Sequence, residues 1–351
     1  MTKNSPRESN LELLRIIAML GIIAHHFVVN STVTDLFSTN NLSVNAKFLV
    51  FWGMWGKTAI NSFILISGYF LCTSKLTWQR YIKLLAEILF YRWIIMLIFA
   101  ATGYEPLTFK LVYHTAFSLL IGINNSFVAS FMIFYAGVPI YNKLIRVINK
   151  RQHGLMLIGL ITMFSIASTI FHANTMNEPF WYMTLYFVAA YIRLYPIQMF
   201  NSLKIAIIFL LVSIILAYGS IVLQLVIHDN HGSAYKYVSD SNKLLAFTVG
   251  FFAFLTAKNA PKFYNKFINI AAAGTFGVLL IHASSDTMRK WLWQEIIQVP
   301  KLYYKDFAFL IVISVITPII IFTICSAIDY MRRKYIEYYF MEWLNNIFNK
   351  K

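Results

Sequence analysis

Long apolar runs, each about the length of a membrane-spanning helix, follow one another along almost the whole chain. A helix needs about 20 mostly apolar residues to cross the hydrocarbon core of a bilayer. Hydrophobic residues make up 59% of the sequence and charged residues 13%, whereas a soluble domain carries about a quarter charged residues. The chain is therefore predicted to be an all-α, polytopic membrane protein.

Ten of these runs are predicted to form transmembrane helices. The eighth run is short, and residues 111–123 could add a re-entrant or interfacial helix. Because no repeat, linker or low-complexity tract divides the chain, we expect one membrane domain over residues 1–351. The ten predicted spans are 11–31, 54–73, 82–102, 126–148, 155–171, 180–194, 203–228, 243–255, 267–285 and 307–330.

The distribution of positive charge supports an even number of spans. With the N-terminus in the cytoplasm, the cytoplasmic segments would hold 19 of the 30 Lys and Arg residues and the outer segments 8. The remaining three, Arg15, Lys57 and Arg92, lie within spans or at their edges. Since Lys and Arg concentrate in cytoplasmic loops, both termini are predicted to be cytoplasmic. The same rule accounts for the net charge of +16 without a nucleic-acid partner.

The C-terminal segment, residues 331–351, is predicted to be an amphipathic helix on the inner membrane surface. Both cysteines, Cys72 and Cys325, lie in apolar runs, so the sequence implies no disulfide framework. It also contains no glycine-rich phosphate loop and no metal-ligand spacing. The apolar face of the C-terminal helix would consist of Phe340, Trp343, Leu344, Ile347 and Phe348.

Three ionisable residues interrupt the first apolar run, RIIAMLGIIAHH, and such residues inside a span are functional candidates. On a helix, Arg15 and His26 would lie within about 20° of one line and roughly 16 Å apart along the axis. His25 would point to another side. Glu12 precedes Arg15 by one turn and can pair with it. Alternatively, Arg15 is an anchor at the cytoplasmic surface, and a histidine only bonds to a neighbouring helix.

A second histidine occurs in the ninth predicted span. His282 would lie roughly 22 Å from the inner end of its helix, and His26 would lie equally far along the first helix. Two imidazoles from distant parts of the chain are therefore expected at similar depth, in the outer half of the membrane. Asp286, four residues later, could orient His282. A histidine near the outer interface could also be purely structural.

Two cations begin the third predicted span. Arg80 and Lys83 share one helical face near the cytoplasm, where they could bind phosphate groups. They could equally be ordinary cytoplasmic positive charges. Glu87 follows Lys83 by one turn and is expected to pair with it. Arg92 lies deeper in the span and needs a partner that the sequence does not identify.

Taken in order, these features resemble the acyltransferase-3 family of integral membrane acyltransferases. ELLRIIAMLGIIAHH is similar to the family's opening pattern, an acidic residue, then Leu-Arg, an apolar stretch and a histidine. Four later segments also resemble family motifs. They are FILISGYF, FMIFYAGVPIYNKL with Pro139 and Asn142, WYMTLYFVAAYIRLY and GTFGVLLIH. Each motif is weak by itself, but five in order cover nearly the whole chain. The resemblance implies ten spans and the acylation of sugars on bacterial cell-surface polysaccharides.

Three departures from the family's pattern affect the candidate site. The family commonly has Arg-x-x-Arg after the second helix, whereas Lys83 follows Arg80 here and lacks the bidentate guanidinium. The acid before Leu-Arg is often Asp followed by Gly, whereas Glu12 is followed by Leu13. No extracellular hydrolase-like domain follows the tenth span, so we expect the chain to transfer the acyl group alone or with a partner.

The family resemblance implies a membrane O-acyltransferase of the bacterial cytoplasmic membrane. The expected donor is cytoplasmic acetyl-CoA, whose phosphates or pantetheine would be bound by Arg15, Arg80 and Lys83. The expected acceptor is a sugar hydroxyl of a cell-surface polysaccharide or of its lipid-linked precursor. The surrounding membrane lipids are the other expected partners, and the sequence does not predict the oligomeric state.

The histidines receive the chemical roles in this hypothesis. His26 would act as general base or as transient acyl carrier, Glu12 would orient Arg15, and His282 would be a second base on the acceptor side. An alternative is a transporter or flippase that moves a glycan or small polar substrate past the same charged residues, although the sequence shows no internal duplication. A third possibility, another acyltransferase fold built around one histidine, lacks the Arg-to-His spacing.

Overall fold

The computed structural model describes residues 8–37, 43–122, 126–227 and 234–349. Within these ranges the chain is 81% helical and contains no strand, which confirms the all-α prediction. Several sequence predictions fall on residues outside this description. They concern the end of the seventh predicted span at residue 228, the end of the additional helix at residue 123, and the lysines and arginine at positions 3, 7, 350 and 351.

Seven helices in the described part of the chain are long and apolar enough to cross a membrane. They coincide with seven of the ten predicted spans. They are α1 (Ser9–Val29), α2 with α3 (Val44–Gly53, Trp55–Leu71), α4 (Trp78–Ala101), α6 (Phe127–Val147), α7 with η2 and α8 (Lys150–Ile161, Thr162–Ile166, Ala167–Ile170), α10 (Leu203–Ile227), and α16 with η6 and α17 (Phe307–Arg332, Arg333–Glu337, Tyr338–Asn349).

The other three predicted spans are helical too, but they are shorter or broken. Helix α9 (Glu178–Leu194) has 17 residues and α11 (Leu244–Asn259) has 16. The ninth predicted span is divided into α12 (Lys266–Ala272) and α13 (Thr275–His282) by a turn. Length and composition thus assign seven crossings, and the count of ten and the cytoplasmic termini remain predictions.

Short helices connect these elements. One of them, α5, is the additional helix that the sequence allowed at residues 111–123. The connecting helices are η1 (Val33–Leu36), α5 (Phe109–Ile121), η3 (Gln198–Asn201), α14 (Asp286–Lys290), η5 (Trp291–Ile296) and α15 (Val299–Leu302).

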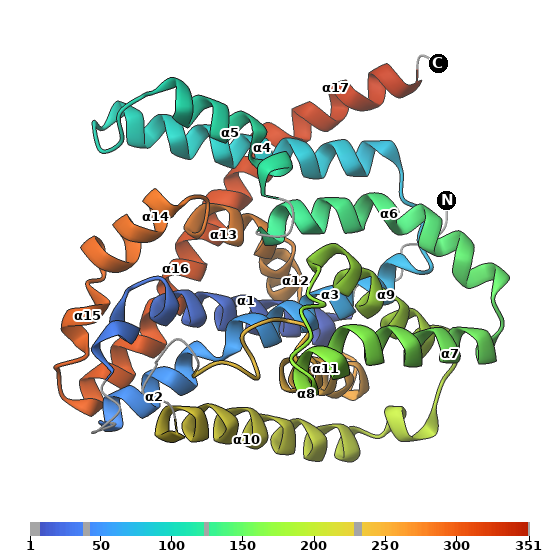
Figure 1. Cartoon of the computed structure of the whole chain (residues 1–351). Helices are drawn as coiled ribbons and strands as arrows, with labels where there is room; N and C mark the ends of the chain where they lie inside the picture. Colours follow the sequence, from blue (N-terminus) through green and yellow to red (C-terminus); the bar gives the residue numbers. More distant parts are fainter. Residues whose placement is uncertain (1–7, 38–42, 123–125, 228–233, 350–351) are drawn as a thin grey trace.

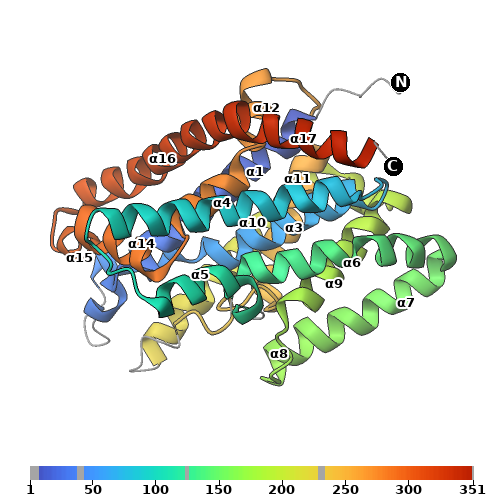
Figure 2. The same ribbon diagram turned by 90° about the horizontal axis from the view of Figure 1, so that it is seen from above.

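Helices α1 and α3 pack along each other and occupy the middle of the bundle (Figure 1). Helix α10 lies along one side against α11, and α4 and α5 lie along the opposite side. Figure 2 shows α4 and α16 running from one end of the molecule towards the other. Following the predicted topology, we name the two ends of the bundle. The end where α1 begins is the inner end, and the end with α2, α14 and α15 is the outer end.

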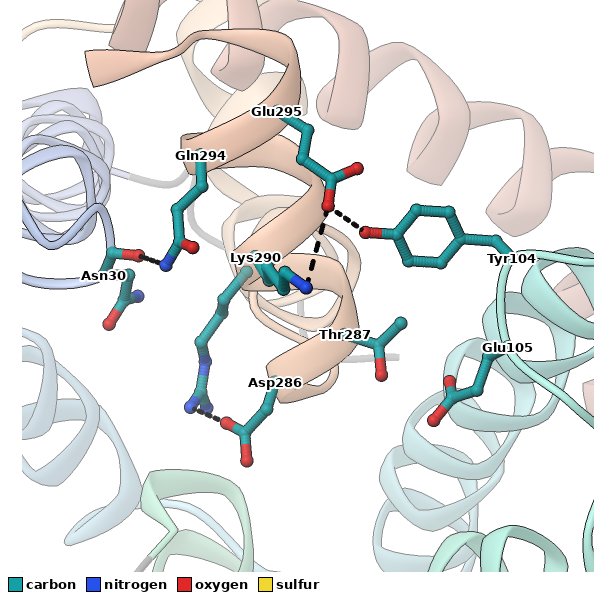
Figure 3. A pocket seen from close by; sticks show the side chains of 9 residues that line it. Asn30, Tyr104, Glu105, Asp286, Thr287, Lys290, Gln294 and Glu295 are labelled. Atoms are coloured by element: carbon teal, nitrogen blue, oxygen red, sulfur yellow. Dashed lines mark hydrogen bonds and ion pairs between the residues drawn. The ribbon is translucent and has the colours of Figure 1, made fainter. Parts of the chain in front are cut away.

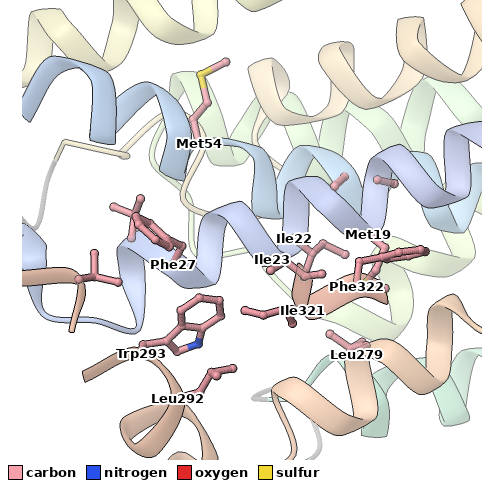
Figure 4. Close-up of a cluster of buried hydrophobic side chains, with 14 of the residues drawn as sticks. Met19, Ile22, Ile23, Phe27, Met54, Leu279, Leu292, Trp293, Ile321 and Phe322 are labelled. Atoms are coloured by element: carbon pink, nitrogen blue, oxygen red, sulfur yellow. The ribbon is translucent and has the colours of Figure 1, made fainter. Parts of the chain in front are cut away.

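A hydrophobic cluster in the outer half of the bundle joins α1 to α13 and α16 (Figure 4). Within it, Phe27 meets Trp293 edge to face, with ring centroids 6.1 Å apart. In a bilayer the lipid is as apolar as these side chains, so close packing rather than exclusion from water holds such helices together. The cluster therefore packs α1 against α13, η5 and α16. Its other labelled members are Met19, Ile22, Ile23, Met54, Leu279, Leu292, Ile321 and Phe322.

A buried acidic residue holds α16 against α4 and α13. Asp329 is fully buried, and its Oδ1 accepts hydrogen bonds from Tyr91 at 2.9 Å and from Arg332 at 3.0 and 2.9 Å. The side chain fits against Gly277 of α13, because a Cβ there would lie 2.3 Å from Asp329 Oδ1. Asp329 therefore forms an ion pair at the same point near the inner end where α16 approaches α13 closely.

The C-terminal segment is helical, as predicted, and continues α16 through the π-helical η6. Of its apolar face, Leu344 is buried, whereas Trp343 and Ile347 are exposed. Exposed apolar side chains of this kind suit contact with a membrane. The predicted position on the inner surface remains a prediction.

Candidate active site

Two histidines from opposite ends of the sequence meet in the outer half of the bundle. His26 lies near the end of α1, and His282 is the last residue of α13. The distance between His26 Nδ1 and His282 Nε2 is 3.1 Å, and the two ring centroids are 5.2 Å apart. The prediction that the two imidazoles reach the same depth is confirmed.

A backbone carbonyl determines where the protons of this pair lie. His282 Nδ1 is 2.6 Å from the carbonyl oxygen of Val278. A carbonyl oxygen only accepts, so His282 Nδ1 carries the hydrogen and, in a neutral ring, His282 Nε2 is an acceptor. His26 Nδ1 must then donate to it. The hydrogen-bond network therefore assigns His26 the tautomer whose Nε2 has an available lone pair.

His25 has different neighbours from His26. Its Nδ1 donates a hydrogen bond to the carbonyl oxygen of Gly53, the last residue of α2, at a distance of 2.5 Å. Its ring fits against Gly56 of α3, where an added Cβ would lie 2.3 Å from the ring. These contacts hold His25 between α2 and α3. The two adjacent histidines therefore have different hydrogen-bond partners, but their ring centroids are only 5.7 Å apart and both line the same cavity.

His26 lines a cavity of about 250 Å³ that also contains four charged residues from other helices. Lys57 of α3 and Glu178 of α9 form an ion pair there, with Lys57 Nζ 3.6 Å from Glu178 Oε1. Arg92 of α4 and Arg289 of α14 complete the set. Sequence reasoning singled out Lys57 and Arg92 as charges in spans without connecting them to His26. It missed Glu178, the first residue of α9, and Arg289, which lies in the short helix α14.

The histidine cavity adjoins two larger polar pockets at the outer end. A pocket of about 710 Å³ shares Arg92, Ser126, Ser284 and Arg289 with it. A pocket of about 750 Å³ shares Asn30 and Arg289. These shared residues place His26 at the deep end of a polar region that extends towards the outer end of the bundle.

Polar contacts shape the outer pocket of about 750 Å³ (Figure 3). The hydroxyl of Tyr104 donates to Glu295 Oε1 at 2.6 Å, and Gln294 Nε2 donates to the carbonyl oxygen of Asn30 at 3.3 Å. Tyr104 lies in a loop outside the spanning helices, and its hydrogen bond to Glu295 raises the pKa of the phenol to about 12. The phenol therefore remains a hydrogen-bond donor at neutral pH.

The structure contradicts the predicted role of Asp286 in orienting His282. The sequence allowed Asp286 to orient His282, but the Asp286 carboxylate pairs with Arg289 at 2.7 Å and is 96% exposed. The Val278 carbonyl occupies the orienting position instead. The prediction was wrong because α13 ends at His282, so the following turn removes Asp286 from the helical register.

Glu12 and Arg15 form the expected pair near the inner end of α1. Arg15 Nη1 is 3.4 Å from Glu12 Oε2, and Glu12 is buried. The Arg15 guanidinium lies over the ring of Phe70, 5.9 Å from its centroid. Arg15 is not among the residues that line the cavity of His26, so the two residues serve different ends of the helix.

Arg80 and Lys83 differ in their surroundings at the start of α4. Arg80 is exposed and donates to a backbone carbonyl of the preceding loop at 3.2 Å. Lys83 pairs with Glu337 of η6, whereas Glu87 pairs with Arg332 at 3.0 Å. The predicted pair between Lys83 and Glu87 was therefore wrong. The sequence could not show that the end of α16 and η6 supply nearer partners.

These features define a membrane protein whose helices enclose a pair of hydrogen-bonded histidines beside a polar cavity. The sequence model of one protein family, described as an acyltransferase domain, matches residues 8–339. The chain belongs to this acyltransferase-3 family, which confirms the resemblance drawn from its motifs. Comparison with curated proteins and with solved structures finds no match.

Proposed function

We propose that this chain is a multi-pass O-acyltransferase of the bacterial cytoplasmic membrane. It would transfer an acetyl group from cytoplasmic acetyl-CoA to a sugar hydroxyl of a cell-surface polysaccharide or of its lipid-linked precursor. Family membership supports acyl transfer. The observation that carries the proposal is the hydrogen-bond chain from Val278 through His282 to His26. It leaves a proton acceptor, His26 Nε2, on a residue that lines a cavity.

In the proposed reaction, His26 Nε2 takes the proton of the sugar hydroxyl while the sugar oxygen attacks the thioester carbonyl carbon. The tetrahedral intermediate then expels the thiolate as its carbon–sulfur bond breaks. Protonated His26 returns the proton to the thiolate, so the products are the sugar ester and the free thiol. A positioned general base contributes about 10²–10⁴-fold to such a step.

His282 acts as a positioning residue in this mechanism. Its Nδ1 donates to Val278 and its Nε2 accepts from His26, so both ring nitrogens are already engaged. This assignment replaces the second-base role that the sequence suggested. The variant mechanism, in which His26 Nε2 itself attacks the thioester and carries the acyl group, uses the same lone pair.

The inner end suits a donor that carries phosphate groups. Arg80 is exposed there, and Arg15 is held by Glu12 one turn away. A guanidinium group can donate two parallel hydrogen bonds to two oxygens of one phosphate. We assign the phosphates of acetyl-CoA to Arg15 and Arg80. Lys83 would exchange its ion pair with Glu337 for a phosphate oxygen.

The acceptor would approach from the outer end through the two polar pockets. Their amide, hydroxyl, carboxylate and cationic side chains are groups that hydrogen-bond to sugars. With ten spans and cytoplasmic termini, a cytoplasmic donor and an outer acceptor would meet at the depth of His26. The mechanism thus requires no movement of either whole substrate across the membrane.

Reconstitution of the purified chain in vesicles with labelled acetyl-CoA and extracted cell-surface glycan tests this function. We expect His26→Ala to lower label incorporation into the glycan by about 10²–10⁴-fold, the contribution of a general base. His153→Ala is a matched control. His153 is also a buried histidine bonded to a backbone carbonyl, that of Phe187 at 3.1 Å, but it does not line the cavity.

Acetyl transfer that survives His26→Ala at the rate of the His153→Ala control would overturn the mechanism. Movement of glycan across the vesicle membrane without incorporation of label would instead favour the transporter. Incubation with labelled acetyl-CoA but without glycan separates the two roles of His26. Label on the protein that disappears in His26→Ala would identify the acyl carrier, and no label on the protein would leave the general base.

A further inference from the structure

The histidine cavity shares five residues with the outer pockets, and we call four of them the donor rim: Asn30, Arg92, Ser284 and Arg289. Among the described residues, Asn30 Nδ2, Ser284 Oγ and Arg289 Nε are buried and have no hydrogen-bond partner. Unsatisfied buried polar atoms are uncommon in proteins and call for an explanation. Asn30 Nδ2 and Arg289 Nε can only donate, and the Ser284 hydroxyl can donate too, so an acceptor of hydrogen bonds can satisfy all three.

Arg92 adds a guanidinium group to this rim. It is half-buried and lies 14 residues after Trp78, about 21 Å along α4. None of the ion pairs formed within the described ranges involves Arg92, and Asp229 is the one acidic residue outside those ranges. An arginine inside a span is costly and is kept where it faces a functional cavity.

Three of the four carboxylates that line the histidine cavity and the outer pockets form ion pairs, and the fourth, Glu105, forms none with the described residues. Glu178 pairs with Lys57, and Asp286 pairs with Arg289 while projecting into solvent. Arg92 and Arg289 line the same two pockets, where their like charges repel. Two mutually repelling guanidinium groups with unsatisfied donors around them form a preorganised anion site, because an anion would relieve the repulsion and accept the hydrogen bonds.

We propose that the donor rim binds a carboxylate or phosphate group of the acceptor saccharide, so that the enzyme acylates an acidic glycan. The inference rests on the proposed function. The position of the rim favours the acceptor over the acyl donor. All four residues line an outer pocket as well as the histidine cavity, whereas the donor would arrive from the inner end.

The rim would select acidic over neutral saccharides, because its hydrogen-bond donors would stay unsatisfied in the complex with a neutral saccharide. Sites built to hydrogen-bond a substrate group reject an analogue without that group by about 10⁴–10⁵-fold when fully enclosed. The donor rim borders open pockets that water can enter, so we expect a smaller preference, of at least about tenfold.

Saccharide binding without any acyl donor provides the test. The purified full-length chain is titrated with a glucuronic-acid oligosaccharide, a phosphorylated oligosaccharide and a neutral glucose oligosaccharide of equal length, and the melting temperature is followed. We expect an acidic ligand to stabilise the protein at a concentration at least tenfold lower than the neutral one. Arg92→Gln should abolish the difference and Arg92→Lys should keep part of it. Lys301→Gln, which removes an exposed outer charge away from the pockets, should keep all of it.

Equal stabilisation by acidic and neutral saccharides, or a preference that persists in Arg92→Gln, would overturn the inference. Because Arg92 forms no ion pair with any residue in the described ranges, Arg92→Gln should melt no lower than the wild type without ligand. If it nevertheless fails to fold, Ser284→Ala tests the same rim and should weaken acidic binding. Stabilisation by succinyl-CoA but not by acidic saccharides would assign the anion to the acyl group and also overturn the inference.

The two proposals fail in distinguishable ways. Acid-selective binding without acetyl transfer in the vesicle assay would contradict the proposed function and retain the anion site. Transfer to a neutral glycan without acid-selective binding would retain the function and remove the anion site.

Discussion

Replacement of His282 by alanine would remove the acceptor that keeps the proton on His26 Nδ1. His282 is fully buried and is not among the residues that line the cavity, so it acts only through His26. The substitution breaks two hydrogen bonds, the 3.1 Å bond from His26 and the 2.6 Å bond to the Val278 carbonyl. The perturbation therefore changes the protonation and orientation of the base without changing the substrate contacts.

The size of the effect follows from these two bonds. Each buried partner left unsatisfied costs about 1–3 kcal/mol of stability, so the melting temperature should fall. For catalysis, His26 loses its fixed tautomer but keeps its ring. We therefore expect kcat to fall by about 10²–10³-fold, less than the upper limit for loss of a general base. In activation free energy this is about 3–4 kcal/mol.

The assay compares acetyl transfer kinetics of His282→Ala and His282→Gln in vesicles, normalised to folded protein. Glutamine has an amide oxygen that can accept from His26 and an amide nitrogen that can donate to Val278. His282→Gln should therefore recover at least tenfold of the loss in kcat, and KM for the glycan should stay constant in both variants. Adding His282→Ala to His26→Ala should cost little more, because the two residues act as a unit.

The reasoning would be refuted by a His282→Ala enzyme whose kcat is within twofold of the wild type. It would also be refuted if glutamine recovered stability but no activity. In that case His282 would support the fold, and the proton arrangement of His26 would not depend on it.

Two further predictions concern stability. Gly277→Ala should lower the melting temperature by an amount equivalent to about 1–3 kcal/mol, because its Cβ would overlap the fixed Asp329 carboxylate. The control Gly159→Ala, where a Cβ meets nothing within 4 Å, should be neutral or stabilising. Equal melting temperatures for the two variants would contradict this prediction. Lys57→Met should cost about 3–5 kcal/mol, since it leaves Glu178 buried and unpaired. The double variant with Glu178→Gln should melt higher than Lys57→Met alone, and a lower value would disprove the ion pair.

The positions of the helices could be predicted from the sequence because lipid-facing helices must be apolar over most of their length. Every predicted span coincides with one to three consecutive helical elements. The break between α12 and α13 was not predicted, because the run around Gly274 stays apolar on both sides of it. The buried Asp329 lies so close to Gly274 and Gly277 that a Cβ at either position would meet its carboxylate, a long-range contact that the sequence does not show.

The candidate site could be predicted only in part. Helical periodicity separated His26 from His25, and equal depth paired His26 with His282. Periodicity gives the direction of a side chain relative to its own helix, but it does not say which helices face one another. For that reason Glu178 and Arg289, which reach the cavity from α9 and α14, could not be connected to His26 from the sequence.

The hydrogen-bond chain at His26 ends on a main-chain atom rather than on a side chain. In many histidine sites a carboxylate orients the ring, and a single substitution removes it. Every amino acid at position 278 would keep the carbonyl oxygen that His282 contacts. Sequence drift at this position can therefore change packing, but it cannot reverse the proton order of the histidine pair while α13 remains helical.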